Sequence, residues 1–143
     1  MKQEISQLLP PDFERLETQR AEIKRHIVAS DLGKFETTQG KLAALRAVIN
    51  ASLYTPEQTF ELQCMGVVLG DAFVQELGCD WAIVEDDYGR DPALKFEGTS
   101  ILLFPLTMIS KRIEKGEDVD VFEVFNGVAD RIRDLKEELA ERT

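Results

Sequence analysis

Residues 55–78 read TPEQTFELQCMGVVLGDAFVQELG, and this stretch decides how the rest of the chain must be arranged. It begins with Thr55 as a capping hydroxyl, then a proline at the first helical position, with Gln58 placed to reach back to the cap. It ends at Gly78, because glycine readily adopts the left-handed conformation that closes a helix. Apolar residues occupy most of the circumference in between, so the stretch predicts a central helix that is buried on more than one side.

Two glycines, Gly66 and Gly70, lie four residues apart within this helix. Each costs about 1 kcal/mol of helix propensity relative to alanine, so a compensating reason is expected. At this spacing the missing side chains leave a groove along the helix in which another backbone could pack closely. Close packing is therefore the expected reason for both glycines, ahead of a ligand-binding role.

The segments before the central helix predict two further helices. Asp12 follows two prolines and suits the cap of a first helix, whose apolar residues keep helical spacing as far as about Ala29. A second helix is expected to begin at Thr37 or Thr38. Residues 1–54 are therefore expected to form an antiparallel helical hairpin.

After the central helix the periodicity changes. Short β-prone runs predict strands at residues 81–84 and 100–104, and an alternating run at 93–97 predicts a strand between them. The five residues before 93 and the two after 97 then serve as turns. Two more helices are expected after the sheet, over residues 106–114 and 119–141.

This order of elements predicts an α+β fold. An N-terminal helical hairpin precedes the central buried helix, a small antiparallel sheet of about three strands follows with helices on one face, and C-terminal helices end the chain. Neither the hairpin nor the sheet could bury enough surface by itself, so residues 1–143 are expected to form a single domain. Within it, residues 1–54 are the helical extension and residues 55–143 are the core.

Negative charge is concentrated in the second half of the chain. The 143 residues carry a formal net charge of −10. Residues 1–70 hold 9 acidic and 8 basic side chains, whereas residues 71–143 hold 18 acidic and 9 basic side chains, so the halves carry −1 and −9. This disfavours nucleic acid as a ligand, because phosphate binding needs clustered lysines and arginines. A basic protein is the more natural partner, although an acidic surface can also serve solubility alone.

Four carboxylates lie within seven residues directly after the apolar run at 81–84. Desolvating each charge would cost several kcal/mol, so we expect a solvated turn or a surface that another molecule reads. A structural interpretation is that Arg90 lies between Asp87 and Asp91 and pins the turn through charge-assisted hydrogen bonds. Both interpretations can hold together. The residues expected to bind a partner are Glu85, Asp86, Asp87, Tyr88, Arg90 and Asp91.

Enzymatic alternatives would use the same carboxylates or His26, the single histidine. The carboxylates could offer oxygen ligands to Mg²⁺ or Ca²⁺, but a count from Asp86 puts Gly89 at the fourth position, where a calcium-binding EF-hand needs glycine at the sixth. His26 has no serine or cysteine tied to it by a local signature. We therefore assign no catalytic residue, no metal and no cofactor.

The cysteines and the apolar segments indicate a compartment. Cys64 and Cys79 are 15 residues apart, which is not a close metal-binding or redox spacing, so both are expected to be buried or partly buried free thiols. No window approaches the roughly 20 apolar residues of a membrane-spanning helix. The first residues lack the apolar stretch of a secretory signal. The chain is therefore expected to be cytoplasmic and not to bind membranes.

Two motifs carry a resemblance to a known family. The first is WAIVEDDYGRDPAL at residues 81–94, and the second is FPLTMISKR at residues 104–112. Together they resemble a bacterial family of domains of unknown function, numbered 3806, over about residues 58–135. The resemblance implies no activity, no catalytic residue and no cofactor, and the N-terminal helical hairpin lies outside it.

The favoured hypothesis is a cytoplasmic binding protein of the immunity or inhibitor kind, which neutralises a basic toxin or enzyme through its acidic surface. Small size, strong negative charge and the missing catalytic groups motivate it. The alternatives are a small metal-dependent hydrolase that uses the acidic turn, or a housekeeping domain of unknown function. A homodimer is a further alternative, since Phe122 would add to a contact patch if it were exposed on the last helix.

Overall fold

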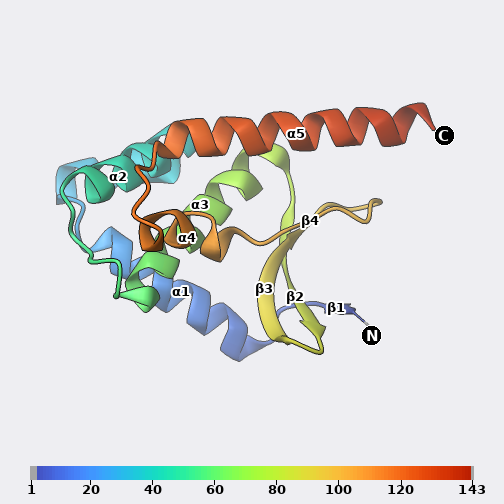
Figure 1. The fold of residues 1–143 in the computed structure, drawn as a ribbon, viewed down its shortest axis with the longest axis horizontal. Coiled ribbons are helices and arrows are strands. Elements are labelled where there is room, and N and C mark those ends of the chain that lie inside the picture. The colour runs from blue at the N-terminus through green and yellow to red at the C-terminus, as the bar shows by residue number, and fades with distance from the viewer. Residues whose placement is uncertain (1–2, 143) are drawn as a thin grey trace.

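The computed structural model describes residues 3–142 and has the predicted α+β fold. In Figure 1 the strands gather at one end, α5 runs along one side, and α1 crosses the opposite side. Short 3₁₀ helices lie at Ala29–Asp31, Lys34–Glu36 and Pro105–Thr107. The strands and α-helices are β1 (Glu4–Ser6), α1 (Pro10–Lys24), α2 (Thr38–Asn50), α3 (Thr59–Leu77), β2 (Asp80–Asp86), β3 (Gly89–Lys95), β4 (Leu102–Leu103), α4 (Ser110–Glu114) and α5 (Val121–Glu141).

α3 is the central helix of the molecule, as predicted. It contacts α1, α2, α4 and α5, and every residue from Cys64 to Gly70 is buried. Phe73 stacks on Phe125 of α5 with ring centroids 4.8 Å apart. Because buried residues cover the whole circumference of the helix in this stretch, α3 is the element on which the other helices assemble.

The start of α3 differs from the prediction. The side-chain oxygen of Gln58 does accept the backbone N–H of Thr55, at 2.7 Å. However, Gln58 is itself the N-cap, and the helix begins at Thr59. The predicted contact therefore closes a turn just before the helix. The predicted stop is confirmed, since Gly78 caps the other end in the left-handed conformation.

Close packing explains both glycines of α3. A Cβ atom on Gly66 would lie 2.4 Å from the Cα of Leu106, so the backbone of the 3₁₀ turn after β4 rests directly on the helix. A Cβ atom on Gly70 would lie 2.4 Å from the ring of Trp81 and 2.9 Å from Cγ of Pro105. The helix therefore admits a backbone at one glycine and an aromatic ring at the other.

The sheet has four antiparallel strands in the order β1-β2-β3-β4, one more than expected. The additional strand, β1, pairs Ile5 with Val84 of β2. Ala82, Ile83 and Val84 are each at most 6% exposed. Since neighbours in a strand point to opposite faces, both faces of β2 are covered here, not the single face that was expected.

The expected turn at residues 88–92 is wrong, because β3 already starts at Gly89. Pro92 lies within β3 opposite Ile83 of β2. Pairing with β4 is confined to Leu94 and Lys95, so within the described chain Pro92 has a strand on one side only, where a missing N–H is tolerated. β4 itself is two residues long, shorter than the predicted strand at 100–104.

The helices before α3 follow the predicted order with different ends. α1 stops at Lys24, and 3₁₀ turns occupy part of the segment before α2. α2 begins as predicted, with the hydroxyl of Thr37 accepting the N–H of Gly40 at 2.9 Å. Asp12 is not the cap of α1. Leu9 is the N-cap, and Asp12 accepts its backbone N–H at 2.8 Å from within the first turn of the helix.

α5 is a helix of 21 residues that begins at Val121, two residues after the expected start, and ends at Glu141 as expected. Asp120 caps it by accepting the N–H groups of Phe122 and Glu123, both at 3.1 Å. Phe122 is half-buried, and the guanidinium of Arg46 lies 4.0 Å above its ring. Phe122 therefore does not form the exposed contact patch that was considered for a homodimer.

Across residues 3–142, neither α5 nor another helix combines the length and apolar content needed to cross a membrane.

Candidate functional site

The acidic residues lie at the tip of the β2–β3 hairpin, which closes with the two-residue loop Asp87-Tyr88. Asp86 and Gly89 are the last paired residues on the two strands. One carboxylate oxygen of Asp86 accepts the backbone N–H of Tyr88 at 2.8 Å. Gly89 has φ 139°, a conformation that residues with a side chain rarely adopt. The loop is therefore shaped by local hydrogen bonding and by glycine.

Exposure separates the residues of this tip. The side chain of Tyr88 is 85% exposed, more than any other large apolar or aromatic residue within residues 3–142. Glu85, Asp87 and Asp91 are exposed, and Asp86 is half-buried by its contact with the loop. The tip therefore presents one aromatic ring among carboxylates that face solvent.

Arg90 anchors the base of the tip to α1, which differs from the expected contacts with Asp87 and Asp91. Its two terminal nitrogens donate to the two carboxylate oxygens of Asp12, at 2.6 and 2.8 Å. Neighbours along a strand point to opposite faces, so Arg90 and Asp91 cannot share one side of the hairpin. Hydrogen bonds from Arg90 and from the N–H of Leu9 lower the pKa of Asp12 to about 2, against the opposing effect of burial.

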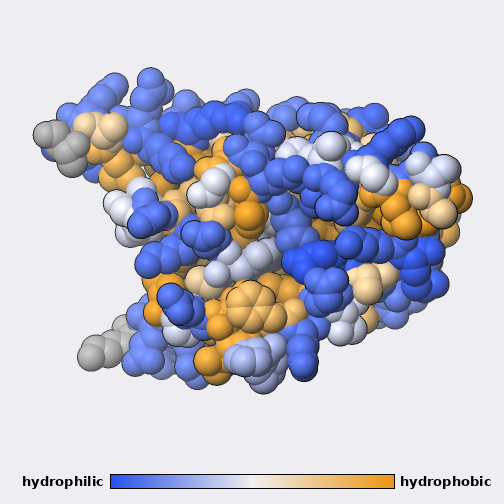
Figure 2. All heavy atoms as spheres, turned by 180° about the vertical axis from the view of Figure 1, so that it is seen from behind, coloured by the Kyte–Doolittle hydropathy of each residue, from blue (hydrophilic) through white to orange (hydrophobic). Residues whose placement is uncertain are grey.

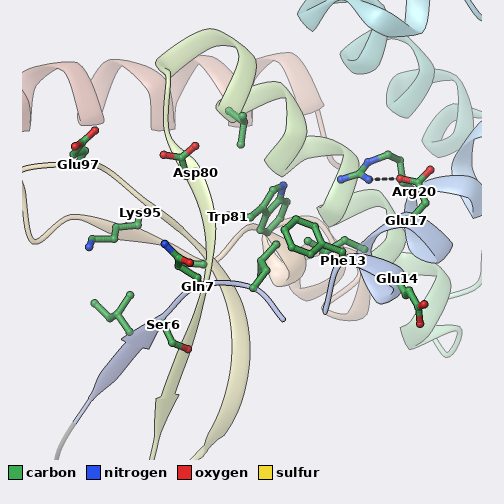
Figure 3. Close-up of a pocket in the computed structure, with 15 residues that line it drawn as sticks. Ser6, Gln7, Phe13, Glu14, Glu17, Arg20, Asp80, Trp81, Lys95 and Glu97 are labelled. Carbon is green, nitrogen blue, oxygen red and sulfur yellow. Dashed lines mark hydrogen bonds and ion pairs between the residues drawn. The ribbon is translucent and has the colours of Figure 1, made fainter. Parts of the chain in front are cut away.

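A groove of about 1150 Å³ lies between α1 and the sheet (Figure 3). Phe13 of α1 and Trp81 of β2 both point into it. Figure 2 shows the molecule from behind relative to Figure 1. Apolar side chains gather in the lower half of this face, where β1 leads into α1. The charged residues that line the groove are Glu14, Glu17, Arg20, Asp80, Lys95 and Glu97.

Asp71 of α3 fixes the wall of this groove. It accepts hydrogen bonds from the indole nitrogen of Trp81 at 3.0 Å and from a terminal nitrogen of Arg20 at 2.9 Å. Arg20 also donates to Glu17 at 2.8 Å, the interaction drawn in Figure 3. The hydrogen bond with Asp71 raises the pKa of Arg20 despite its partial burial. The ring of Trp81 is thereby held in one orientation at the edge of the groove.

Sequence reasoning missed this groove and the role of Asp71. Its lining comes from β1, α1, α3 and the sheet, so no single stretch of sequence carries it. Two charged residues that interrupt apolar patterns were nevertheless visible in the sequence. Arg20 takes an apolar slot in the first helix, and Asp71 interrupts the apolar run of the central helix. An arginine and a carboxylate that both break apolar patterns are candidates for pairing with each other.

His26 belongs to a polar cluster that joins the end of α1 to the segment before α3. The hydroxyl of Tyr54 donates to Glu22 at 2.7 Å and lies 2.9 Å from Nε2 of His26. The hydrogen bond from Arg25 is the main factor that lowers the pKa of Glu22, while burial raises that of Tyr54. This cluster connects two chain segments, and the hydroxyl beside the histidine is that of Tyr54, whose pKa is raised.

The two cysteines are buried free thiols, as predicted. Burial raises the pKa of Cys64 to about 12 and that of Cys79 to about 11. Thiols with such values stay protonated near neutral pH and are poor nucleophiles.

The carboxylates of the tip do not converge on one point. Glu85 lies opposite Arg90 across the hairpin, and Asp86 is engaged by the loop. Among residues 3–142, no three histidine, cysteine, aspartate or glutamate side chains are placed together to hold a metal ion.

Comparisons with known proteins place the chain in a family. A family described as "Domain of unknown function (DUF3806)" matches residues 41–125. This match includes most of α2, which the sequence motifs had placed outside the resemblance. No curated protein matches the chain.

A crystal structure of a protein from Bacteroides thetaiotaomicron VPI-5482 is similar, with a TM-score of 0.69 and 15% sequence identity. The similarity covers 92% of this chain and 48% of that chain, so this chain spans about half the length of that protein. At this identity the likeness shows the fold alone. Since the family match spans more than half of its 143 residues, this chain belongs to the DUF3806 family.

Proposed function

We propose that this chain is a cytoplasmic binding protein that captures a basic protein through the tip of the β2–β3 hairpin. The partner is a basic toxin or enzyme. Binding would block its activity, in the way that immunity and inhibitor proteins block theirs. One observation carries the proposal: Tyr88 at the tip of the hairpin is 85% exposed, and the exposed carboxylates of Glu85, Asp87 and Asp91 lie within three residues of it along the chain.

Tyrosine suits the centre of a binding surface. Its ring brings a large contact area with few rotatable bonds, and tyrosine is enriched among the residues that dominate binding energy. The surrounding carboxylates would attract a basic partner and speed association more than they would add affinity.

Hydrogen bonds within the chain also fix the shape of the tip. Asp86 and Gly89 set the loop, and the two hydrogen bonds from Arg90 to Asp12 tie the strand beside it to α1. A surface that is already ordered loses less conformational entropy when it binds.

A charge reversal at the tip tests the proposal. The double variant Asp87→Lys/Asp91→Lys should fold normally and lose the basic partner in a pull-down from the source cells, followed by identification of the bound proteins. The matched control is Asp134→Lys/Glu137→Lys, which makes the same change of charge at exposed positions on α5. Recovery of the same proteins by the tip variant and by the wild type would contradict the proposal.

A second variant removes the ring and keeps the charge. Tyr88→Ala should weaken capture of the same partner, whereas Phe60→Ala, at a phenylalanine that is 53% exposed on α3, should not. Equal loss with both variants would show that exposed aromatic side chains in general, and not the tip, retain the protein.

A further inference from the structure

We infer that the groove between α1 and the sheet binds an extended, basic segment of a protein partner, which inserts one bulky apolar side chain between Phe13 and Trp81. The inference rests on the proposed function, because it names a second surface through which the same basic partner is recognised. The groove lies apart from the tip, since none of the residues that line it belongs to Glu85–Asp91.

The walls of the groove are apolar where an inserted side chain would lie. Two of the apolar residues that line it are exposed: Phe13 is 61% exposed and Ile5 is 42% exposed. The hydrogen bond from Trp81 to Asp71 holds the indole ring at the groove with its polar atom already satisfied. Apolar side chains collected in a concave place mark a site for an apolar group of another molecule.

The rim of the groove selects a basic occupant. Four carboxylates line it, from Glu14, Glu17, Asp80 and Glu97. Glu17 pairs with Arg20, which Asp71 also binds, so the carboxylates left for an occupant are Glu14, Asp80 and Glu97, and Lys95 is the cation that opposes them. Lysine or arginine side chains on either side of the inserted residue would meet carboxylates. A second copy of this chain, with its net charge of −10, would be repelled.

The dimensions favour an extended segment. The volume of about 1150 Å³ lies above the range of roughly 300–1,000 Å³ that is typical of small-molecule sites. One wall is the edge strand β1 with Gln7 and Leu8, which run beside the groove. A peptide in an extended conformation can lie along such a wall and direct alternate side chains inward.

Trp81 reports occupancy directly, because it is the single tryptophan of the chain. The probe is the peptide acetyl-Lys-Lys-Phe-Leu-Lys-Lys-amide, which contains no tryptophan or tyrosine. Titration should change the tryptophan emission saturably, and the binding should weaken as salt screens the rim charges. Replacing the lysines by glutamates, or the central pair by serines, should each weaken binding by at least about tenfold.

Variants of the whole chain locate the site. Phe13→Ser should weaken peptide binding by at least about tenfold, whereas Phe60→Ser, at a similarly exposed phenylalanine outside the groove, should leave it unchanged. Glu14→Lys/Glu97→Lys should weaken it in the same way, against Asp134→Lys/Glu137→Lys as the control. Circular dichroism confirms that each variant is folded.

The inference is overturned if the emission shows no saturable change, if the acidic peptide binds equally well, or if Phe13→Ser binds as the wild type does. It is also overturned if light scattering shows a dimer whose dissociation is needed for the peptide to bind. The tip variant Asp87→Lys/Asp91→Lys should bind the peptide normally. Its separate result in partner capture therefore decides the proposed function independently of the groove.

Discussion

The helical part and the sheet end of this molecule are held together by different kinds of contact. In the helical part, Leu69 and Phe73 of α3 are fully buried among apolar side chains from the surrounding helices. At the sheet end, a hairpin with an acidic tip is tied to the helices by directed polar contacts, Arg90 to Asp12 and Trp81 to Asp71. Apolar burial supplies most of the stability, whereas the directed contacts decide where the tip and the groove lie.

The largest effect is expected from a cavity in the helical part. Phe73→Ala removes a fully buried ring that stacks on Phe125 and should lower the free energy of unfolding by about 4 kcal/mol. Urea denaturation measures the change. Phe13→Ala removes the same ring from an exposed position and should stay within about 0.5 kcal/mol of the wild type. Similar losses for both variants would break the comparison.

The two glycines of α3 test the joint between the two regions. Gly66→Ala meets the backbone of Leu106 and should cost about 3 kcal/mol. Gly70→Ala meets no backbone atom but the ring of Trp81 and Cγ of the Pro105 ring; the indole can turn aside if it gives up its hydrogen bond to Asp71, so the cost should be smaller. It should also shift the tryptophan emission in the folded state, which Gly66→Ala should not. A larger loss of stability for Gly70→Ala would show that the ring is as rigidly held as the backbone.

The tie between α1 and the hairpin should contribute less than the core. Asp12→Ala removes a carboxylate that accepts hydrogen bonds from Arg90 and Leu9, and should cost about 2 kcal/mol. Asp31→Ala, which removes an exposed ion pair with Lys34, should cost under about 0.5 kcal/mol. Thermal unfolding measures both. The double variant with Arg90→Ala should cost less than the sum of the single changes, since both remove the same contact.

The same tie predicts a dependence on pH. The pKa of Asp12 is about 2 in the folded chain against an ordinary value of 3.8, so the unfolded chain binds the proton more readily. The stabilisation is complete above about pH 4 and is lost as the pH falls towards about 2. The difference in Tm between the wild type and Asp12→Asn should therefore shrink over this range. A difference that stays constant would show that the charge of Asp12 does not stabilise the fold.

The smallest effect on stability is expected at the tip. Tyr88 is almost fully exposed, so Tyr88→Ala should change the free energy of unfolding by no more than about 0.5 kcal/mol. Amide hydrogen exchange of β2 and β3 should also remain as in the wild type. Faster exchange in both strands would mean that the ring stabilises the hairpin, and its exposure would then say less about binding.

Local patterns were enough to predict the helices and the fold class. The start of α2, the stop at Gly78 and the spacing of Gly66 and Gly70 each depend on neighbours in sequence. β1 was missed because three exposed residues carry no alternating pattern, and pairing with β2 alone orders them as a strand. Pro92 was assigned to a turn because its place in β3 depends on how far β4 extends.

The candidate surfaces were predicted only in part. A dense run of carboxylates indicated exposure, and the structure exposes Glu85, Asp87 and Asp91. The partner of Arg90 could not be found in the same way, because Asp12 is 78 residues away and local charge favoured the neighbouring aspartates. The groove was invisible for the same reason, since chain segments that meet only on folding form its walls.

Asp12 and Phe13 are consecutive residues of α1, and they serve the two different surfaces. Asp12 fixes the strand beside the tip, and Phe13 lines the groove. Neighbouring residues of one helix therefore connect the two surfaces, and no flexible linker lies between them. When a partner reaches both surfaces, binding at the second surface becomes intramolecular once the first is bound. Two weak contacts at a fixed separation would then give a slow overall dissociation.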